Sequence, residues 1–324
     1  GRHLLVAVNQ SCATWSQTPR DLANPLAYLD TVLADVADCP SVRVGTVADV
    51  ATGREGANVA LRVDLDMDLP AALGMAQLAE RREVPLSFYL LHTAGYYGAF
   101  VEGRFRRNCD MVEQYRFLQK RGMEIGLHID PYGVYLTHGM DGATAVAQEV
   151  AWLRKKGMKI RGVAAHNVAP VYGAENFEIF RGWRIRAEDT FVRDGRTLPV
   201  GALDEREMGI EYEAGLPGPA DGDPEAREAY LAGLPEGDFL RSPEWFRTYL
   251  LDNPYCRWGY SYRAWLLGRD FWALGGTTRS GENVFRFGIG WREVVEFLRG
   301  LQPDETCLVL LHPIYLGRRS DPGG

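Results

Sequence analysis

Short apolar segments alternate with helical segments over the first half of the chain and again at its end. Segments of this length and composition are typical of strands buried in a parallel sheet. Strands that alternate with helices predict an α/β fold with a parallel sheet or barrel, in which functional side chains gather at the carboxyl ends of the strands. The predicted strands are Leu4–Val8, Val42–Val47, Val59–Asp64, Leu86–Leu91, Glu124–His128, Ile160–His166 and Cys307–Leu311.

Helices are predicted between these strands. Several of them have proline in the first turn or glycine directly after the last residue, which are typical helix boundaries. The predicted helices are Leu69–Glu80, Met111–Arg121, Ala143–Lys156 and Trp291–Arg299. We expect the whole chain, 1–324, to form one domain.

The alternation stops after about residue 187. Glu213–Glu236 is rich in proline, glycine and acidic residues, which predicts a long irregular insertion at about 188–290, before the last strand. Within it, Ser242 and Pro243 are typical of a helix start. The insertion either closes part of a cleft, forms a flexible loop, or packs between copies of a homo-oligomer.

Aromatic residues cluster in the same region. They form either a local hydrophobic core or a platform on which sugar rings stack. The cluster comprises Tyr255, Trp258, Tyr260, Tyr262, Trp265, Phe271 and Trp272.

Composition argues against several classes of partner. The net charge is −7 and no basic run is present, so we do not expect nucleic-acid binding. No apolar stretch approaches the roughly 18 residues of a membrane span. The five cysteines have no C-x-x-C spacing, which favours reduced thiols and, with no signal peptide in the sequence, a cytoplasmic protein.

Three aspartates follow one another at alternate positions where the strand Val59–Asp64 ends. Asp64, Asp66 and Asp68 would project to one side of an extended chain, where their like charges repel. A bound cation would offset this repulsion. The alternative is a strand that runs out into a solvated acidic turn.

Three histidines also lie at predicted strand ends: His128, His166 and His312. A single histidine of this kind is usually a hydrogen-bonded structural residue. Three of them, together with the aspartates, favour one shared metal site. Mixed His/Asp ligation suits zinc, and also nickel, cobalt or iron. His92 follows another strand and either lines a substrate cleft or is structural.

These motifs resemble those of the polysaccharide deacetylases, the NodB-homology group of carbohydrate esterase family 4. Arg62-Val-Asp64-Leu-Asp66 is similar to the first motif of the family, Gly122-Met-Glu-Ile-Gly-Leu-His128 to a later strand, and Leu311-His312-Pro313 to the last motif. The resemblance covers roughly residues 58–170 and 305–315. It implies a distorted (β/α)-barrel of about seven parallel strands and metal-dependent removal of an acyl group from a sugar.

The resemblance also implies roles for individual residues. Asp64 matches the catalytic base, Asp66 the metal-binding aspartate, His128 the first metal histidine, and His312 the histidine that assists the leaving group. Asp68 matches no family role and is either a solvated acid or a helix N-cap.

The sequence departs from the family pattern four residues after His128, where a second histidine is expected and Tyr132 stands. We predict that His166 supplies the third ligand, with Asp130 as the alternative. The arginine motif of the family is only hinted at by Arg161. Further candidates for contact with substrate are Arg62, His92 and Tyr132.

The sequence therefore predicts a metal-dependent hydrolase that removes an N-acetyl or O-acyl group from an aminosugar-containing small molecule or glycoconjugate. The alternative is a catalytically degenerate barrel that binds carbohydrate or acts as an interaction module. A different metal-dependent barrel enzyme, such as a sugar isomerase or C–C lyase, is the least favoured because the repeated acidic strand ends of an isomerase are missing.

Overall fold

The computed structural model describes residues 19–53, 56–67, 69–166, 176–184, 186–215, 243, 247, 260–278 and 280–317. Several predictions fall on other residues. The strand Leu4–Val8, most of the helix after Ser242, the aromatic residues Tyr255 and Trp258 and the role of Asp68 lie outside the described residues.

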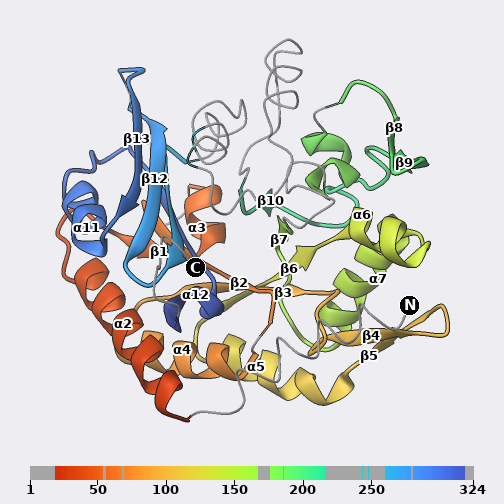
Figure 1. The fold of residues 1–324 in the computed structure, drawn as a ribbon, viewed down its shortest axis with the longest axis horizontal. Helices are drawn as coiled ribbons and strands as arrows, with labels where there is room; N and C mark the ends of the chain where they lie inside the picture. The colour runs from red at the N-terminus through yellow and green to blue at the C-terminus, as the bar shows by residue number, and fades with distance from the viewer. Residues whose placement is uncertain are drawn as a thin grey trace.

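A ten-stranded sheet forms the centre of the described part of the chain (Figure 1). Every pairing from β10 to β11 is parallel, and only the β11–β12 and β12–β13 pairings are antiparallel. The strand order is β10 (Tyr212–Glu213), β7 (Gly162–Ala165), β6 (Glu124–Ile129), β3 (Leu86–Leu91), β2 (Val59–Leu65), β14 (Cys307–Leu311), β11 (Tyr262–Gly268), β12 (Phe271–Thr277) and β13 (Asn283–Ile289), with β1 (Val44–Gly45) beside the start of β2.

This architecture confirms the prediction of an α/β fold with a mostly parallel sheet. Among the described residues, β10 and β13 are the two edges of the sheet and do not pair with each other. Closure into a distorted barrel, and the single-domain organisation, therefore stay predictions.

The prediction of an irregular insertion at 188–290 is wrong for about the last third of that range. Residues from Tyr262 to Ile289 form β11, β12 and β13, which extend the central sheet beyond β14. The aromatic cluster explains the difference, because Tyr260, Tyr262 and Trp272 are buried and belong to the hydrophobic core. Aromatic residues are common in strands, so a cluster of them does not by itself indicate a platform for a ligand.

Helices cover one side of the sheet, and Figure 1 shows α2, α4, α5 and α7 along that side. Connecting turns and hairpins surround the sheet. The longer helices are α2 (Pro19–Ala37), α4 (Leu69–Arg81), α5 (Val112–Lys120), α7 (Gly142–Lys155) and α11 (Trp291–Arg299). The shorter elements are α3 (Val47–Ala51), α6 (Pro131–Gly133), α12 (Pro313–Gly317), the helical turns Cys109–Met111, Val134–His138, Phe177–Ile179 and Arg181–Trp183, and the hairpins β4 (Gly98–Val101)–β5 (Arg104–Arg107) and β8 (Thr190–Arg193)–β9 (Arg196–Pro199).

Four of the predicted helices are present at nearly the expected bounds, and α2 was not foreseen. Gly122 and Gly157 follow α5 and α7 with φ of 81° and 90°, the left-handed conformation expected after a helix. No helix in the described part of the chain is both long and apolar enough to cross a membrane. The free cysteines there include Cys39 and Cys307, which are buried, and Cys109, which is exposed.

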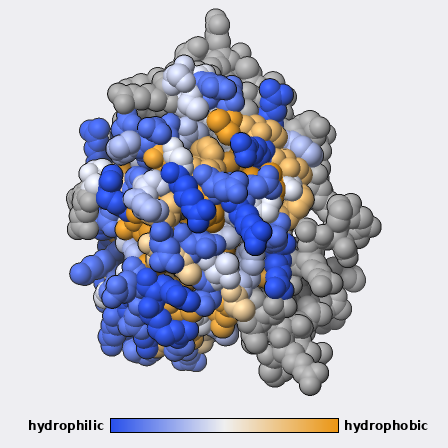
Figure 2. Space-filling view, turned by 90° about the vertical axis from the view of Figure 1, so that its left-hand side faces the viewer, coloured by the Kyte–Doolittle hydropathy of each residue, from blue (hydrophilic) through white to orange (hydrophobic). Residues whose placement is uncertain are grey.

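The outward face of the helix layer is polar. Figure 2 views the molecule from the side of α2 and α11 and shows mostly hydrophilic side chains, with hydrophobic ones between them. In α11 the apolar side chains of Trp291, Val294 and Leu298 turn inward, which is the expected arrangement for an amphipathic helix.

The two faces of the sheet differ in chemistry, and β2 shows this most clearly. Val59, Leu61, Val63 and Leu65 belong to the core between sheet and helices. Arg62 and Asp64 alternate with them and therefore project from the opposite face, although both are buried. We call this second face, which also carries Ala60, Tyr89, Glu124, His128, Ala164 and Tyr212, the polar face of the sheet.

Two tyrosine rings lie across the polar face because glycines leave them space. A Cβ atom at Gly126 would collide with the ring of Tyr89, and one at Gly162 would collide with the ring of Tyr212. The two hydroxyls are 3.0 Å apart, and the Tyr212 hydroxyl donates to Glu124 Oε1 at 2.5 Å. This buried chain of hydrogen bonds supports the strands directly below the functional residues.

Candidate metal centre

Four parallel strands deliver acids and imidazoles to the same edge of the sheet. Asp64 lies in β2 and Asp66 directly follows it, whereas His128 lies in β6. His166 follows β7 and His312 follows β14. Because these strands run in parallel, their carboxyl ends meet, as predicted from the sequence.

Asp66, His128 and His166 form a candidate metal-binding group. One ligand atom from each residue lies within 4.8 Å of the other two. Nε2 of His128 is 3.2 Å from Asp66 Oδ1, and Nε2 of His166 is 3.7 Å from the same oxygen. Ligand atoms that share one zinc ion at about 2.0–2.1 Å are separated by roughly 3.4 Å in tetrahedral geometry, so the arrangement has the right scale.

The hydrogen bonding of these atoms also fits a cation. Asp66 Oδ1 is buried and has no hydrogen-bond partner among the described residues, although the Asp66 side chain as a whole is 28% exposed. Nδ1 of His128 lies 2.8 Å from the carbonyl oxygen of Ala164. A carbonyl only accepts, so Nδ1 carries the proton in the neutral ring and the lone pair on Nε2 points toward Asp66. The Asp66 carboxylate oxygen and the His128 lone pair therefore lie close enough to share one cation.

Asp64 is held beside this group by an arginine of its own strand. Arg62 donates from Nε to Oδ1 and from Nη2 to Oδ2 of Asp64, both at 2.7 Å, and the two side chains are 6% and 3% exposed. Burial by itself raises the pKa of Asp64, but Arg62 and the nearby imidazoles outweigh it and keep the pKa below its usual value. Asp64 therefore stays ionised at neutral pH.

His312 lies on the other side of the two aspartates. Its Nε2 is 3.7 Å from Asp64 Oδ2 and 3.6 Å from Asp66 Oδ2. Its Nδ1 is buried without a hydrogen-bond partner among the described residues. Burial lowers the pKa of His312 despite the two carboxylates, so the ring is neutral at neutral pH.

His166 faces a carboxylate on each side. Its Nε2 faces Asp66, and its Nδ1 is 3.7 Å from Asp130 Oδ2. Burial lowers the pKa of His166, but these carboxylates outweigh that effect and the net shift is upward. The pKa of Asp130 is lowered, because His166 and other donors outweigh the effect of burial.

Three candidates from the sequence do not face this group. The hydroxyl of Tyr132 donates to the carbonyl of Pro199 at 2.8 Å, and the residue is fully buried. Nε2 of His92 accepts from the backbone N–H of Asp130 at 2.7 Å, a structural role. Arg161 forms a two-point ion pair with Glu211 at the partly exposed opposite end of β7.

Two buried residues near His166 were not foreseen. Glu213 accepts from the backbone N–H groups of Ala165 at 2.8 Å and of Gly215 at 2.7 Å, and so fastens the chain before His166. Asn176 donates to Asp130 Oδ1 and to the carbonyl of His166. Glu213 stood in the predicted insertion, and nothing in the sequence around Asn176 marked it.

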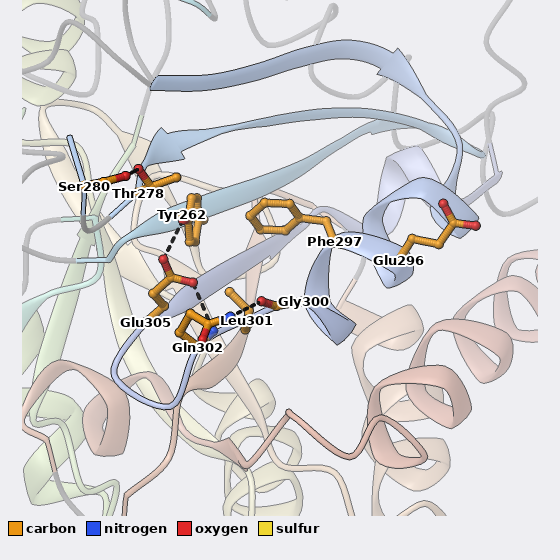
Figure 3. Close-up of a pocket in the computed structure, with 9 residues that line it drawn as sticks. All are labelled: Tyr262, Thr278, Ser280, Glu296, Phe297, Gly300, Leu301, Gln302 and Glu305. Carbon is orange, nitrogen blue, oxygen red and sulfur yellow. Dashed lines mark hydrogen bonds between the residues drawn. The ribbon is translucent and has the colours of Figure 1, made fainter. Parts of the chain in front are cut away.

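A cavity of about 700 Å³ lies elsewhere, between β11, α11 and the loop before β14 (Figure 3). Its lining includes Tyr262, Phe297 and Glu305. Tyr262 begins β11 and Glu305 precedes β14, so this cavity is at the amino ends of the parallel strands, away from the metal-binding group. The Tyr262 hydroxyl donates to Glu305 Oε1 at 2.8 Å, so both polar groups are already paired.

The chain matches no protein-family model, no curated protein and no solved structure.

Proposed function

We propose that the chain is a metal-dependent deacetylase that removes an N-acetyl or O-acyl group from an aminosugar-containing small molecule or glycoconjugate. One observation carries this proposal: the candidate metal ligands Asp66, His128 and His166 lie beside Asp64, which is paired with Arg62, and beside a histidine, His312. The resemblance of the sequence motifs to polysaccharide deacetylases supports it, as does the parallel sheet. In this proposal the sheet is part of a distorted barrel.

The proposed cation is zinc, with nickel, cobalt or iron as alternatives for the same ligand types. When bound, it supplies Lewis-acid chemistry, lowering the pKa of a water molecule and polarising the carbonyl of the acyl group. Three ligands from the chain would leave one coordination position of a tetrahedral zinc ion open to water or substrate.

Asp64 and His312 transfer protons in this proposal. Asp64, kept ionised by Arg62, takes a proton from the attacking water as general base. His312 is neutral at rest, and its Nε2 is 3.7 Å from Asp64 Oδ2, so it is placed to receive that proton and deliver it to the departing amine or alcohol. The proton removed from water thus leaves with the product, and both side chains return to their starting states.

The proposal is tested with metal analysis and acetate release. The purified chain should contain about one equivalent of metal and release acetate from at least one of a panel of acetylated aminosugars. Asp64→Asn should lower turnover by about 10²–10⁴-fold, the usual contribution of a general base, while retaining the metal. Asp30→Asn, which changes an exposed carboxylate on α2, is the control.

Two results would contradict the proposal. Full activity of D64N would exclude Asp64 as the base. Absence of stoichiometric metal together with no acetate release would favour the alternative, a carbohydrate-binding or interaction module.

A further inference from the structure

The residue four positions after His128 is turned away from the candidate metal centre by the local backbone. Asp130 caps the short helix α6, with Pro131 in its first turn, and its Oδ1 accepts from the N–H of Gly133 at 3.2 Å. This turn directs Tyr132 into the core, where its ring meets Phe191 edge-on at 5.1 Å between centroids. The side chain at position 132 therefore belongs to the hydrophobic core in this fold.

His166, which follows the neighbouring strand β7, belongs to the candidate metal-binding group. Hydrogen bonds hold its backbone at both the N–H and the carbonyl. Its N–H donates to the carbonyl of Ile129 in β6 at 2.8 Å. Its carbonyl accepts from Nδ2 of Asn176 at 2.6 Å. These bonds fix the position of the Cα atom but leave the rotation of the imidazole open.

Asp130 faces the imidazole of His166 from the side opposite to Asp66. The carboxylate of Asp130 is buried, and its Oδ2 is 3.7 Å from Nδ1 of His166, a nitrogen that is buried and without a hydrogen-bond partner among the described residues. A metal-bound imidazole carries a proton on its other nitrogen, and that proton is usually donated to a carboxylate, a carbonyl or water. Asp130 Oδ2 is the carboxylate oxygen placed to accept it after a small rotation.

The side-chain amide of Asn176 links Asp130, the backbone of His166 and the backbone of Tyr132. It is fully buried, and its Nδ2 donates to Asp130 Oδ1 at 3.1 Å as well as to the carbonyl of His166. Its Oδ1 accepts from the N–H of Tyr132 at 3.1 Å. The amide thus uses both donors and its acceptor, and it fixes the carboxylate of Asp130 relative to the backbone of His166.

We propose that Asp130 and Asn176 are positioning residues that orient His166 with Nε2 toward the metal. Asp130 is a support for the ligand and not a ligand itself. This inference rests on the metal centre of the proposed function.

The test uses cobalt as the probe with the full chain, measured by its absorption spectrum and by competition with a chelator. Asp130→Asn should weaken cobalt binding by about 10- to 100-fold, the usual effect of removing such a supporting carboxylate, and should alter the cobalt spectrum. Asn176→Ala should act in the same direction. Glu149→Gln is the matched control, because Glu149 is an equally buried carboxylate that binds Tyr97 and Arg107 instead.

The outcomes separate this inference from the proposed function. If the wild-type chain binds no cobalt, the metal centre itself is wrong. If His166→Ala abolishes binding but D130N and N176A bind cobalt with wild-type affinity and spectrum, only the positioning role is wrong.

A measurement without variants covers the case in which these proteins do not fold. Nitrogen-15 NMR of the zinc-loaded wild-type chain should show His166 bound through Nε2 and protonated at Nδ1. Metal bound through Nδ1 would overturn the inference.

Discussion

The buried pair of Arg62 and Asp64 gives a prediction that can be tested without a substrate. Arg62→Met keeps the unbranched apolar stem of the side chain but removes the charged guanidinium group. It leaves Asp64, whose side chain is only 3% exposed, as a carboxylate without its two-point partner. We expect this variant to fold less stably at neutral pH.

The size of the effect follows from the two hydrogen bonds that are lost. Each joins charged groups at 2.7 Å, and such bonds contribute about 1.5–3 kcal/mol each. Breaking one partner of a buried ion pair costs about 3–5 kcal/mol in general, which agrees with that sum. The free energy of unfolding should therefore fall by about 3–5 kcal/mol.

The assay is urea unfolding at neutral pH and again at acidic pH. Arg62 lowers the pKa of Asp64 in the folded protein, so the pair stabilises the wild type above the pKa of an unfolded aspartate and stops doing so as pH falls through the lower folded pKa. In R62M the folded pKa rises instead, and protonation relieves the penalty. The difference in stability between wild type and R62M should shrink as pH falls.

Arg82 and Asp30 provide a matched control. They form the same two-point pair, with both distances 2.7 Å, but their side chains are 41% and 37% exposed. Arg82→Met should not change stability measurably, since exposed pairs are screened by water. A loss of less than about 1 kcal/mol for R62M, or an equal loss for both variants, would refute the reasoning from burial.

Two further predictions concern the neighbouring strands. Burial lowers the pKa of His92 to about 4, so the folded protein favours the neutral ring. Stability should fall as pH drops from about 6.5 toward 4, by roughly 3 kcal/mol for this group, and the slope of unfolding free energy against pH should be shallower in His92→Asn. An identical slope would show that His92 does not titrate differently on folding. Gly126→Ala should cost about 1–3 kcal/mol, because its Cβ meets the ring of Tyr89, and the same substitution should cost much less in thermal unfolding when Tyr89 is already replaced by leucine. An equal cost of Gly126→Ala in both backgrounds would place the strain elsewhere.

Of the four strands that carry the candidate site, the sequence predicted β2, β6 and β14 to within one residue, whereas β7 was predicted as Ile160–His166 and is Gly162–Ala165. Leu86–Leu91 and Cys307–Leu311 have the predicted bounds, and the β2 and β6 strands extend one residue further than expected. Continuous apolar runs flanked by helices determine such strands, and the side chains at their ends then meet because parallel strands share one direction. The grouping of Asp66, His128 and His166 was accordingly predictable.

What the sequence did not predict depends on contacts between distant segments. The strand β11 has aromatic residues on both faces and follows a region without periodicity, so its pairing with β12 and β14 is what identifies it. Asn176 acts through three partners that are 10 to 46 residues away in sequence. A residue of this kind produces no local sequence pattern, because its role depends on partners that only the fold brings close.

The alternation of chemistry along β2 also bears on how the sheet assembles. A shift of the strand by one residue would turn Arg62 and Asp64 into the apolar layer beneath the helices and expose Leu61 and Val63 on the polar face. Burying two charges among aliphatic side chains would cost far more than a mispaired apolar strand normally does. The charged residues that serve the candidate site therefore also disfavour a shifted register of β2. Substitutions that made β2 uniformly apolar would increase its hydrophobicity but would make a shifted register easier to form.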